Sequence, residues 1–220
     1  MNEDEIEWKR LSILGSYQVL DTAAEKAYDH LTNLAAAVCD APISLVSFVD
    51  EKRQWFKART GLTVSETPRE HSFCAHVICG DETVIVEDAT KDERFKDNPL
   101  VTDSPQIRFY AASPLTVQGG WHLGTLCVID KKPRKLLSAQ MKALEVIRDA
   151  VVTQLEYRRA VEDVKELASL LPMCTWCRSV KLEGEREEVW IPLHKYVAKL
   201  GPVQHGICPS CRSQVVLDGD

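Results

Sequence analysis

The sequence predicts an α+β, sandwich-like fold in which helices flank a central antiparallel sheet of five to six strands. Three observations lead to this prediction. Strand-like apolar runs bounded by turn residues fill the middle of the chain, two helical patterns precede them, and one long helical pattern follows them. A small cysteine-rich tail comes last. We therefore expect a sheet-containing domain with its N-terminal helices at 1–137, a long helix at 138–171 and a small module at 172–220.

Two helices are expected before the sheet. Within residues 6–20, Leu11, Leu14 and Tyr17 lie at helical spacing. A second, amphipathic helix is expected to begin near Glu25 and to end before Pro42, because proline cannot continue a helix. Its apolar face is expected to consist of Tyr28, Leu31, Leu34, Ala35 and Val38.

Apolar runs bounded by turns predict the strands. The expected strands span 43–49, 54–59, 83–87, 108–117 and 122–129. The first two form a hairpin around Asp50-Glu51-Lys52. The last two are joined by Gln118-Gly119-Gly120, where glycine permits the positive backbone angles of a tight turn. The sheet is therefore expected to be largely antiparallel.

The segment 61–106 is the least regular part of the chain and is rich in Pro, Asp, Arg and His. Only short helices are expected in it, around 73–79 and 92–95. Long irregular insertions in compact domains are usually functional or mobile. A pocket is therefore expected on this segment.

A long helix is expected from Ser138 to about Leu171. Its apolar residues recur every three to four positions, at Leu144, Ile147, Val151, Leu155, Ala160 or Val161, Val164 and Leu167. The helix is expected to run beyond the domain. Its second half combines charge pairs with an apolar stripe, which suits self-association as well as packing on its own sheet. A homodimer is therefore predicted.

Four cysteines near the end of the chain give its strongest chemical signal. Cys174 and Cys177 form one CxxC pair, and Cys208 and Cys211 form a second. Four thiolates can bind Zn²⁺ tetrahedrally and leave no open position, so a structural zinc site is predicted. Two buried or disulfide-bonded pairs are the alternative, which a chain without an export signal disfavours. His205 could also replace one thiolate as a ligand.

Charge and hydropathy argue against several classes of partner. A formal net charge of −6 gives no long basic stripe, so nucleic acid is not an expected partner. No apolar run approaches the roughly 18 to 20 residues of a membrane-spanning helix, and the acidic start at 1–5 does not resemble a secretory leader. We therefore expect a cytoplasmic protein without a membrane partner.

Residues 5–160 contain a series of short motifs. In chain order these motifs are Tyr17-Gln-Val-Leu-Asp-Thr22, Phe48-Val-Asp50, Gln54-Trp-Phe-Lys57, Ser72-Phe-Cys-Ala-His76, Val86-Glu-Asp88, Asp92-Glu-Arg-Phe95, Asn98-Pro-Leu-Val101, Arg108-Phe-Tyr110, Pro114-Leu115 and Leu123-Gly-Thr-Leu-Cys-Val-Ile-Asp130. Together they resemble the GAF domains of bacterial sensor proteins. The resemblance implies a small-molecule pocket that loops cover on one face of the sheet. The terminal motifs Cys174-Thr-Trp-Cys177 and His205-Gly-Ile-Cys-Pro-Ser-Cys211 look like the short cysteine-rich tail of some bacterial signalling proteins.

Nine residues on the irregular segment and the following strand are candidates for ligand binding, because the family places its pocket there. They are His71, Cys74, His76, Asp88, Asp92, Arg94, Asn98, Arg108 and Tyr110. The alternative is a polar network that fixes the long loop, with Arg94 or Arg108 paired to Asp88 or Asp92.

The segment 69–76 has two possible roles. Ser72 is expected to cap a short helix whose apolar face includes Phe73 and Val77. A metal or redox centre is the alternative, because the same segment carries His71, Cys74 and His76.

A sensor is the expected function. A small molecule in the pocket would bias the long helix and, through it, a dimer interface or a signalling partner. An enzyme is the alternative class, because some GAF proteins reduce free methionine sulfoxide with cysteines, and Cys74, Cys79 and Cys127 are available here. A third possibility is an interaction scaffold that binds no ligand.

Overall fold

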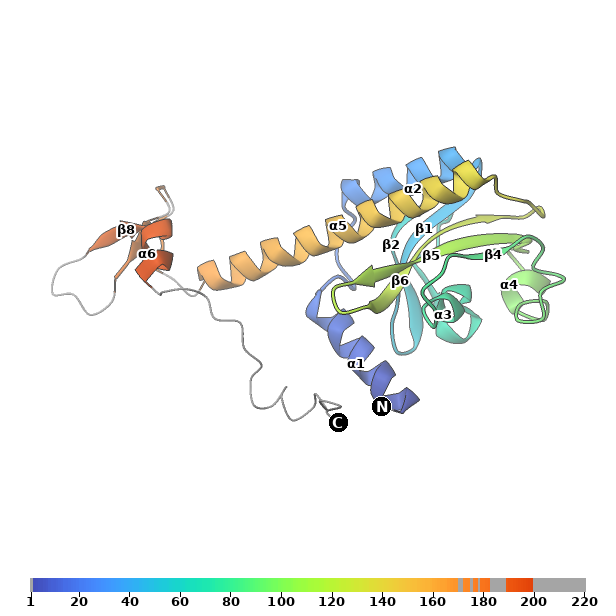
Figure 1. Ribbon diagram of the computed structural model, residues 1–220, viewed down its shortest axis with the longest axis horizontal. Helices are drawn as coiled ribbons and strands as arrows, with labels where there is room; N and C mark the ends of the chain where they lie inside the picture. Colours follow the sequence, from blue (N-terminus) through green and yellow to red (C-terminus); the bar gives the residue numbers. More distant parts are fainter. Residues whose placement is uncertain (1, 170–171, 175, 178, 183–188, 200–220) are drawn as a thin grey trace, which may run out of the picture. The chain divides into compact units, whose positions relative to one another are not determined.

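The computed structural model describes residues 2–169, 172–174, 176–177, 179–182 and 189–199. The chain divides into two compact units, Met1–Val161 and Glu162–Asp220 (Figure 1). The boundaries expected at 137 and 171 stay predictions.

A six-stranded antiparallel sheet forms the centre of the first unit, in the order β3-β2-β1-β6-β5-β4 (Figure 1). This confirms the predicted α+β class. The strands are β1 (Ile43–Val49), β2 (Arg53–Thr60), β3 (Glu66–Pro68), β4 (Val84–Val86), β5 (Phe109–Val117) and β6 (Trp121–Asp130).

Turn chemistry sets the register of the central hairpins. Gly119 and Gly120, between β5 and β6, have φ angles of 86° and 78°, and residues with a Cβ rarely adopt such positive values.

The edge strand β3 was not predicted. It has three residues and ends in Pro68. It pairs antiparallel with β2, with Thr67 opposite Gln54. So short a strand carries no alternating pattern that a sequence could reveal.

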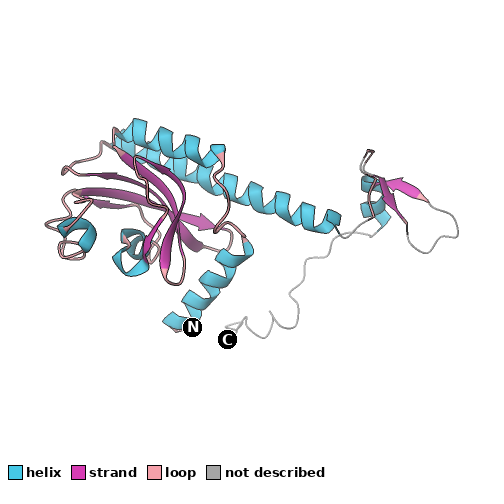
Figure 2. Cartoon of the chain, turned by 180° about the vertical axis from the view of Figure 1, so that it is seen from behind, coloured by secondary structure: helices cyan, strands magenta, loops and turns pink. Residues whose placement is uncertain are grey.

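Helices cover both faces of the sheet. The helix α2 (Lys26–Cys39) lies beside α5 (Ser138–Ser169) over one face, as Figures 1 and 2 show. The short helices α3 (Phe73–Val77) and α4 (Pro99–Thr102) lie over the other face, and a 3-10 turn at Arg69–His71 precedes α3. The first helix, α1 (Glu3–Ser16), begins with a capping box formed by Asn2 and Glu5.

Each face of the sheet has its own hydrophobic core, because successive strand residues point to opposite sides. Toward α2 and α5 the core contains Tyr17, Tyr28, Val46, Phe48, Phe109, Leu115, Leu126 and Leu144. Toward α3 it contains Leu45, Phe56, Phe73, Val77, Phe95, Tyr110 and Cys127. The second core carries the site.

Two details of the helix predictions were wrong. Leu34 and Val38 are 48% and 38% exposed, while the buried residues of α2 are Tyr28, Thr32, Ala35, Ala36 and Cys39. The small side chains among them allow the helix to lie close to the sheet, so the buried face is rotated from the one expected. Residues 92–95 form turns, and the helix begins later, where Asn98 caps Pro99 at the first helical position.

The long helix α5 has the expected apolar stripe within the first unit. Leu144, Ile147, Val151 and Leu155 are at most 5% exposed. Val164, in the second unit, is 61% exposed, and the side chain of Leu167 lies outside the described residues.

The described part of the second unit is a small hairpin followed by a helix. β7 (Ser179–Lys181) pairs with β8 (Trp190–Pro192), and α6 (Leu193–Lys199) follows. Val180 is fully buried there. Across the described residues of both units, no helix is long and apolar enough to span a membrane.

Candidate functional site

A cavity of about 350 Å³ lies on the α3 side of the sheet. It is bounded by strands β1, β2, β5 and β6, by α3 and by two stretches of the long irregular segment. The residues that line it are Ile43, Leu45, Gln54, Phe56, Leu62, Thr63, Val64, Glu66, Thr67, Pro68, Phe73, Cys74, Leu100, Ser104, Pro105, Ile107, Tyr110, Cys127 and Ile129. Its location agrees with the prediction of a pocket on this segment.

The cavity is mostly apolar, with a few polar groups. Glu66 is the one charged side chain among the described residues that line it, and none of them is cationic. The Thr67 hydroxyl is buried and has no hydrogen-bond partner within the described chain. Such a lining suits an uncharged molecule, because a buried anion needs a cationic or strongly donating partner.

Cys74 enters the cavity wall from the short helix α3. Ser72 caps this helix as expected, since its hydroxyl accepts a hydrogen bond of 3.1 Å from the Ala75 amide. Phe73 stacks on Phe95 with ring centroids 4.0 Å apart, which holds the helix on the sheet. Cys74 itself is 1% exposed.

Four side chains hydrogen-bond to the Cys74 sulfur. Gln54 Nε2 and Thr125 Oγ1 each donate from 3.0 Å, and Ser47 Oγ donates from 3.4 Å. The Tyr110 hydroxyl lies 3.1 Å away. These side chains come from β1, β2, β5 and β6, so the whole centre of the sheet contributes to the surroundings of this sulfur.

The orientation of Gln54 follows from its second contact. The Ser72 hydroxyl donates to Gln54 Oε1, so the amide NH₂ of Gln54 must point to Cys74. A neutral thiol is a weak donor and a weak acceptor. Several donors converging on one sulfur therefore fit a thiolate better than a thiol.

The electrostatics of the cluster agree with this geometry. Burial raises the pKa of the Cys74 thiol, but hydrogen bonds from Cys127, Ser47, Thr125 and Tyr110 outweigh it and lower the pKa to about 6. The hydrogen bond to Cys74, followed by burial, raises the pKa of Cys127 well above its usual value. Burial and the charge of Cys74 also raise the pKa of Tyr110, so its hydroxyl keeps the proton that it donates.

Cys74 and Tyr110 are the two of the nine candidate ligand-binding residues that line the cavity. His76 is exposed and meets the edge of Phe95. His71 is half-buried, and its carbonyl accepts a hydrogen bond of 3.1 Å from Asn98 Nδ2. The structure thus does not bring His71, Cys74 and His76 together in one centre.

The four charged candidates hold the loop in place instead of facing the cavity. Asp92 pairs with Arg94 at 2.7 Å, and Asp88 pairs with Lys91 at 3.0 Å. Arg108 donates to the carbonyls of Val101 and Ile107, at 2.9 and 3.0 Å. These contacts match the alternative reading, in which polar side chains fix the long loop.

Sequence reasoning missed most of the cavity wall, including Gln54 and Thr67. Gln54 gave no clear signal, because Arg53, Lys57, Arg59 and Thr60 make the same strand polar at several other positions. Thr67 gave none, because it lies on the short edge strand β3. Among the remaining cysteines, Cys79 is exposed and does not line the cavity, whereas Cys127 does.

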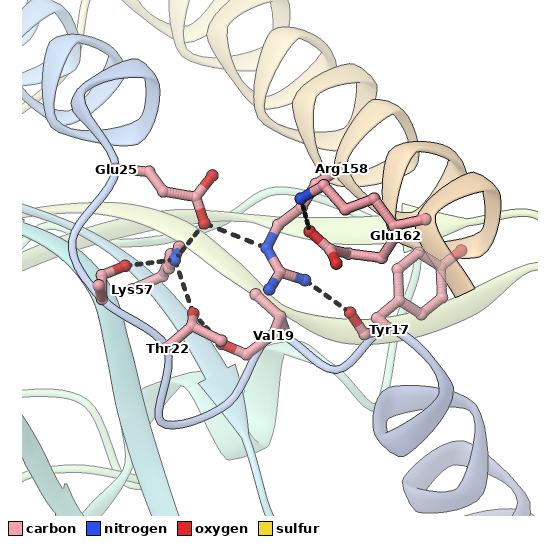
Figure 3. A network of polar contacts seen from close by, with 9 residues as sticks. Tyr17, Val19, Thr22, Glu25, Lys57, Arg158 and Glu162 are labelled. Carbon is pink, nitrogen blue, oxygen red and sulfur yellow. Dashed lines mark hydrogen bonds and ion pairs between the residues drawn. The ribbon is translucent and has the colours of Figure 1, made fainter. Parts of the chain in front are cut away.

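A second cluster lies on the opposite face of β2, where Lys57 is fully buried (Figure 3). Its ammonium group donates to Glu25 Oε1 at 2.6 Å, to Thr22 Oγ1 at 2.7 Å and to the Ala23 carbonyl at 2.8 Å. Burial lowers the pKa of Lys57, while the hydrogen bond to Glu25 opposes this shift. We call Tyr17, Thr22, Glu25, Lys57 and Arg158 the Lys57 network.

The Lys57 network reaches the long helix α5 through Arg158 (Figure 3). Arg158 Nε donates to the same Glu25 oxygen at 3.1 Å, and its Nη1 donates to the Tyr17 carbonyl at 2.9 Å. The Tyr17 hydroxyl in turn donates to Glu156 at 2.7 Å. Burial and this bond to Glu156 raise the pKa of Tyr17 to about 12.

Strand β2 therefore connects the two clusters. Gln54 and Phe56 line the cavity on one face, and Lys57 meets Glu25 on the other. A displacement of β2 by a molecule in the cavity would change the Lys57–Glu25 and Glu25–Arg158 contacts that hold α5.

The described cysteines of the second unit lie close together. Cys174 and Cys177 line a surface depression with Met173, Ser179 and Trp190. Hydrogen bonds with Ser179, followed by one with Cys174, lower the pKa of Cys177. Cys208 and Cys211, with His205, lie outside the described residues. No cluster of three or more metal-binding side chains occurs within the described ranges, which hold only half of the predicted zinc ligands.

Comparison with known proteins places this fold in a family. A cyclic di-GMP phosphodiesterase of Pseudomonas aeruginosa is 36% identical over 184 residues, which are 83% of this chain and 31% of the relative. The chain thus spans about a third of the length of that relative.

Solved structures share the fold at low sequence identity. The GAF domain from Acinetobacter phosphoenolpyruvate-protein phosphotransferase superposes with a TM-score of 0.52 at 19% identity, covering 73% of this chain and 98% of that one. The chromophore-binding domain of a bacteriophytochrome from R. palustris superposes with a TM-score of 0.54 at 10% identity, covering 74% and 64%. The family model described as GAF domain matches residues 18–155. This chain therefore belongs to the GAF domain family.

Proposed function

We propose that this protein is a cytoplasmic signal-sensing protein whose GAF domain binds a small molecule in the cavity and transmits the binding event through α5 to a partner or a second copy. One observation carries the proposal. Strand β2 lines the cavity with Gln54 and Phe56 and, on its other face, joins α5 through Lys57, Glu25 and Arg158. The six described cysteines are free, which is in keeping with a reducing compartment.

The lining of the cavity limits the class of ligand. The relative named above acts on cyclic di-GMP, whose two phosphates would need cationic partners. No arginine or lysine is found among the described residues that line this cavity. The proposed ligand is therefore small and uncharged, and the long irregular segment provides one side of its site.

The lining of the cavity also disfavours the reductase alternative. Free methionine sulfoxide carries a carboxylate and an ammonium group. Glu66 could meet the ammonium, but the described lining provides no cation for the carboxylate. Cys79 is exposed and outside the cavity wall, so a mechanism that uses all three cysteines has no geometric support.

Native mass spectrometry of the purified full chain tests the ligand proposal. We expect a co-purified small molecule that is lost from a Leu62→Trp variant, because Leu62 is a partly exposed residue of the cavity wall. Leu34→Trp is the matched control, since Leu34 is 48% exposed on α2. Equal binding in both variants would show that the molecule lies elsewhere.

Self-association through α5 is part of the proposal. Val146 and Tyr157 are 62% and 65% exposed on this helix, and eleven positions apart they share one face. Sedimentation of the full chain at several concentrations, compared with a Val146→Glu variant, tests it. A monomer at all concentrations would leave a signalling partner as the recipient of the signal.

We also propose that Cys174, Cys177, Cys208 and Cys211 bind a structural Zn²⁺. Support comes from the two CxxC motifs and from the proximity of Cys174 to Cys177, whose lowered pKa favours the thiolate that zinc requires. In this role the metal would stabilise a segment too small to form an adequate core of its own.

A further inference from the structure

The environment of Cys74 calls for a chemical explanation beyond packing. A buried cysteine usually behaves as a small hydrophobe with few polar contacts. Here Gln54, Thr125, Ser47 and Tyr110 direct polar hydrogens at one sulfur, from 3.0 to 3.4 Å. All four residues are at most 5% exposed. Side chains from four strands of the sheet thus stabilise negative charge on that sulfur.

A second thiol lies in the same cavity wall. It belongs to Cys127 of β6, which is the first of the groups that lower the pKa of Cys74. Cys79, on the same segment as Cys74, is exposed and donates to the Ala75 carbonyl at 3.3 Å, outside this cluster. The wall of this one cavity therefore holds one activated sulfur and one protonated thiol.

We propose that Cys74 and Cys127 form a redox pair in the cavity wall, which a small uncharged hydroperoxide oxidises to a disulfide. The inference deepens the proposed sensor function, on which it rests, because it names the stimulus that this cavity detects. An uncharged oxidant suits a lining that, among its described residues, carries no cation. The bond between the sulfurs would join α3 to β6 directly.

The chemistry proceeds in two balanced steps. The Cys74 thiolate attacks the terminal oxygen of the hydroperoxide, the O–O bond breaks, and the alkoxide or hydroxide leaves and takes up a proton. Cys74 is then a sulfenic acid. The Cys127 thiol attacks its sulfur, the S–O bond breaks and water leaves. In total, two thiols and one hydroperoxide give a disulfide, an alcohol and water, with two electrons passing from the sulfurs to the peroxide.

The Tyr110 hydroxyl has a positioning role in this scheme. It lies 3.1 Å from the Cys74 sulfur and keeps its proton, because burial and the charge of Cys74 raise its pKa. It can stabilise the thiolate before the reaction. Gln54 acts in the same way through its amide, which Ser72 holds in one orientation.

The test exposes the folded full chain to tert-butyl hydroperoxide, blocks the remaining thiols by alkylation and identifies the products by peptide mass spectrometry. We expect a Cys74–Cys127 disulfide that dithiothreitol reverses. Below pH 6 its rate of formation should fall about tenfold per pH unit, as the thiolate is protonated. Cys127→Ser should leave a sulfenic acid on Cys74 that dimedone traps.

Control variants separate activation from packing. Cys79→Ser should react like the parent protein. Tyr110→Phe should slow disulfide formation at neutral pH and move the midpoint of the pH profile upward, a shift that lost packing alone does not produce. If Cys74 and Cys127 stay reduced in the folded chain and react only in urea, or if Cys79 takes the place of either, the redox pair is overturned.

Ligand binding is measured separately. A Cys74→Ser, Cys127→Ser double variant that still binds the co-purified molecule, in a parent protein that forms no disulfide, would uphold the sensor and reject the redox pair. Disulfide formation in a chain that carries no ligand would uphold the redox pair and reject the binding of a co-purified ligand.

Discussion

At Gly124 the backbones of two central strands lie in close contact. A Cβ at this position of β6 would come within 1.9 Å of the Ser47 carbonyl oxygen and 2.8 Å of Phe48 Cα on β1. Both are backbone atoms of a fully buried strand, so neither can move aside easily. Gly124→Ala is therefore expected to lower the free energy of unfolding by about 3 kcal/mol, at the upper end of overpacking effects. Urea denaturation measures this change.

Gly15 provides the matched control. It lies in the last turns of α1, and a Cβ there would meet no atom within 4 Å. Gly15→Ala should raise the free energy of unfolding by up to about 1 kcal/mol, because alanine is the better helix former. Similar losses in both variants would contradict the account given for Gly124.

Glu7 is expected to make stability depend on acid pH. It accepts hydrogen bonds from Arg10 at 2.7 and 2.8 Å and from Arg69 at 2.5 Å. Burial raises its pKa, but the two arginines outweigh this and lower the pKa to about 2. Because the folded pKa lies below the unfolded one, the contribution is present above about pH 4.5 and is lost as the pH falls toward 2.

The Glu7→Gln variant measures this contribution. Glu7 is 33% exposed, so screening by solvent limits the expected loss to about 1 kcal/mol at pH 7. Urea denaturation at pH 7 and pH 3 should show a gap between parent and variant that narrows in acid. A gap that stays constant would mean that the charge of Glu7 is not the cause.

At the scale of the elements, Arg158 attaches α5 to the segment between α1 and α2. Arg158 is 13% exposed and bonds to Glu25 and to the Tyr17 carbonyl. Arg158→Met is expected to lower the free energy of unfolding by about 1 to 3 kcal/mol, because the Tyr17 carbonyl loses this donor and Glu25 loses one of its two cationic partners. The amides of 153–161 should then exchange hydrogen faster.

Lys142→Met is the control for that experiment, since Lys142 is an exposed residue of the same helix. It should change neither quantity. Unaltered exchange in Arg158→Met would show that apolar contacts alone, such as those of Leu155, hold this part of α5.

Elements with a clear periodic pattern could be predicted from the sequence. β1, β2, β5 and β6 are apolar runs bounded by turns, and α5 repeats its apolar residues at helical spacing. The edge strand β3 and helix α4 could not be predicted, because three or four residues carry no period. The buried face of α2 was misplaced because alanine and threonine occupy it where leucine and valine were expected.

The site was predictable only in outline. Its location followed from the irregular segment, and Cys74 and Tyr110 were among the candidates. The remaining lining comes from residues far apart in the sequence, such as Leu45, Ile107 and Ile129, which folding brings to one face. The Lys57 network has the same origin, since Glu25, Lys57 and Arg158 meet only after the sheet and α5 have packed.

For the whole molecule, the two units are expected to respond differently to metal removal. A chelator should unfold the segment 172–220 and leave the sheet domain intact, because the predicted zinc contributes to the stability of the small module only. Metal analysis by mass spectrometry, combined with circular dichroism during chelation, measures both effects. Cys174→Ser should reproduce the effect of the chelator, whereas Cys79→Ser, an exposed cysteine of the first unit, should not. A metal-free chain with an unchanged melting curve would reject the zinc proposal.

The two clusters on opposite faces of the sheet constrain the length of β2 more tightly than its amino-acid composition. Gln54 and Lys57 point to opposite sides of one strand, and their three-residue separation fixes which side each faces. Deleting one residue between them would move Lys57 to the position of Phe56, on the cavity face, and Ala58 to the position of Lys57. The ammonium group would then enter the apolar cavity, and Ala58 would face Glu25. A point substitution in this strand can weaken one of the two clusters by itself. The loss of one residue should abolish both ligand binding in the cavity and the contacts of the Lys57 network with α5.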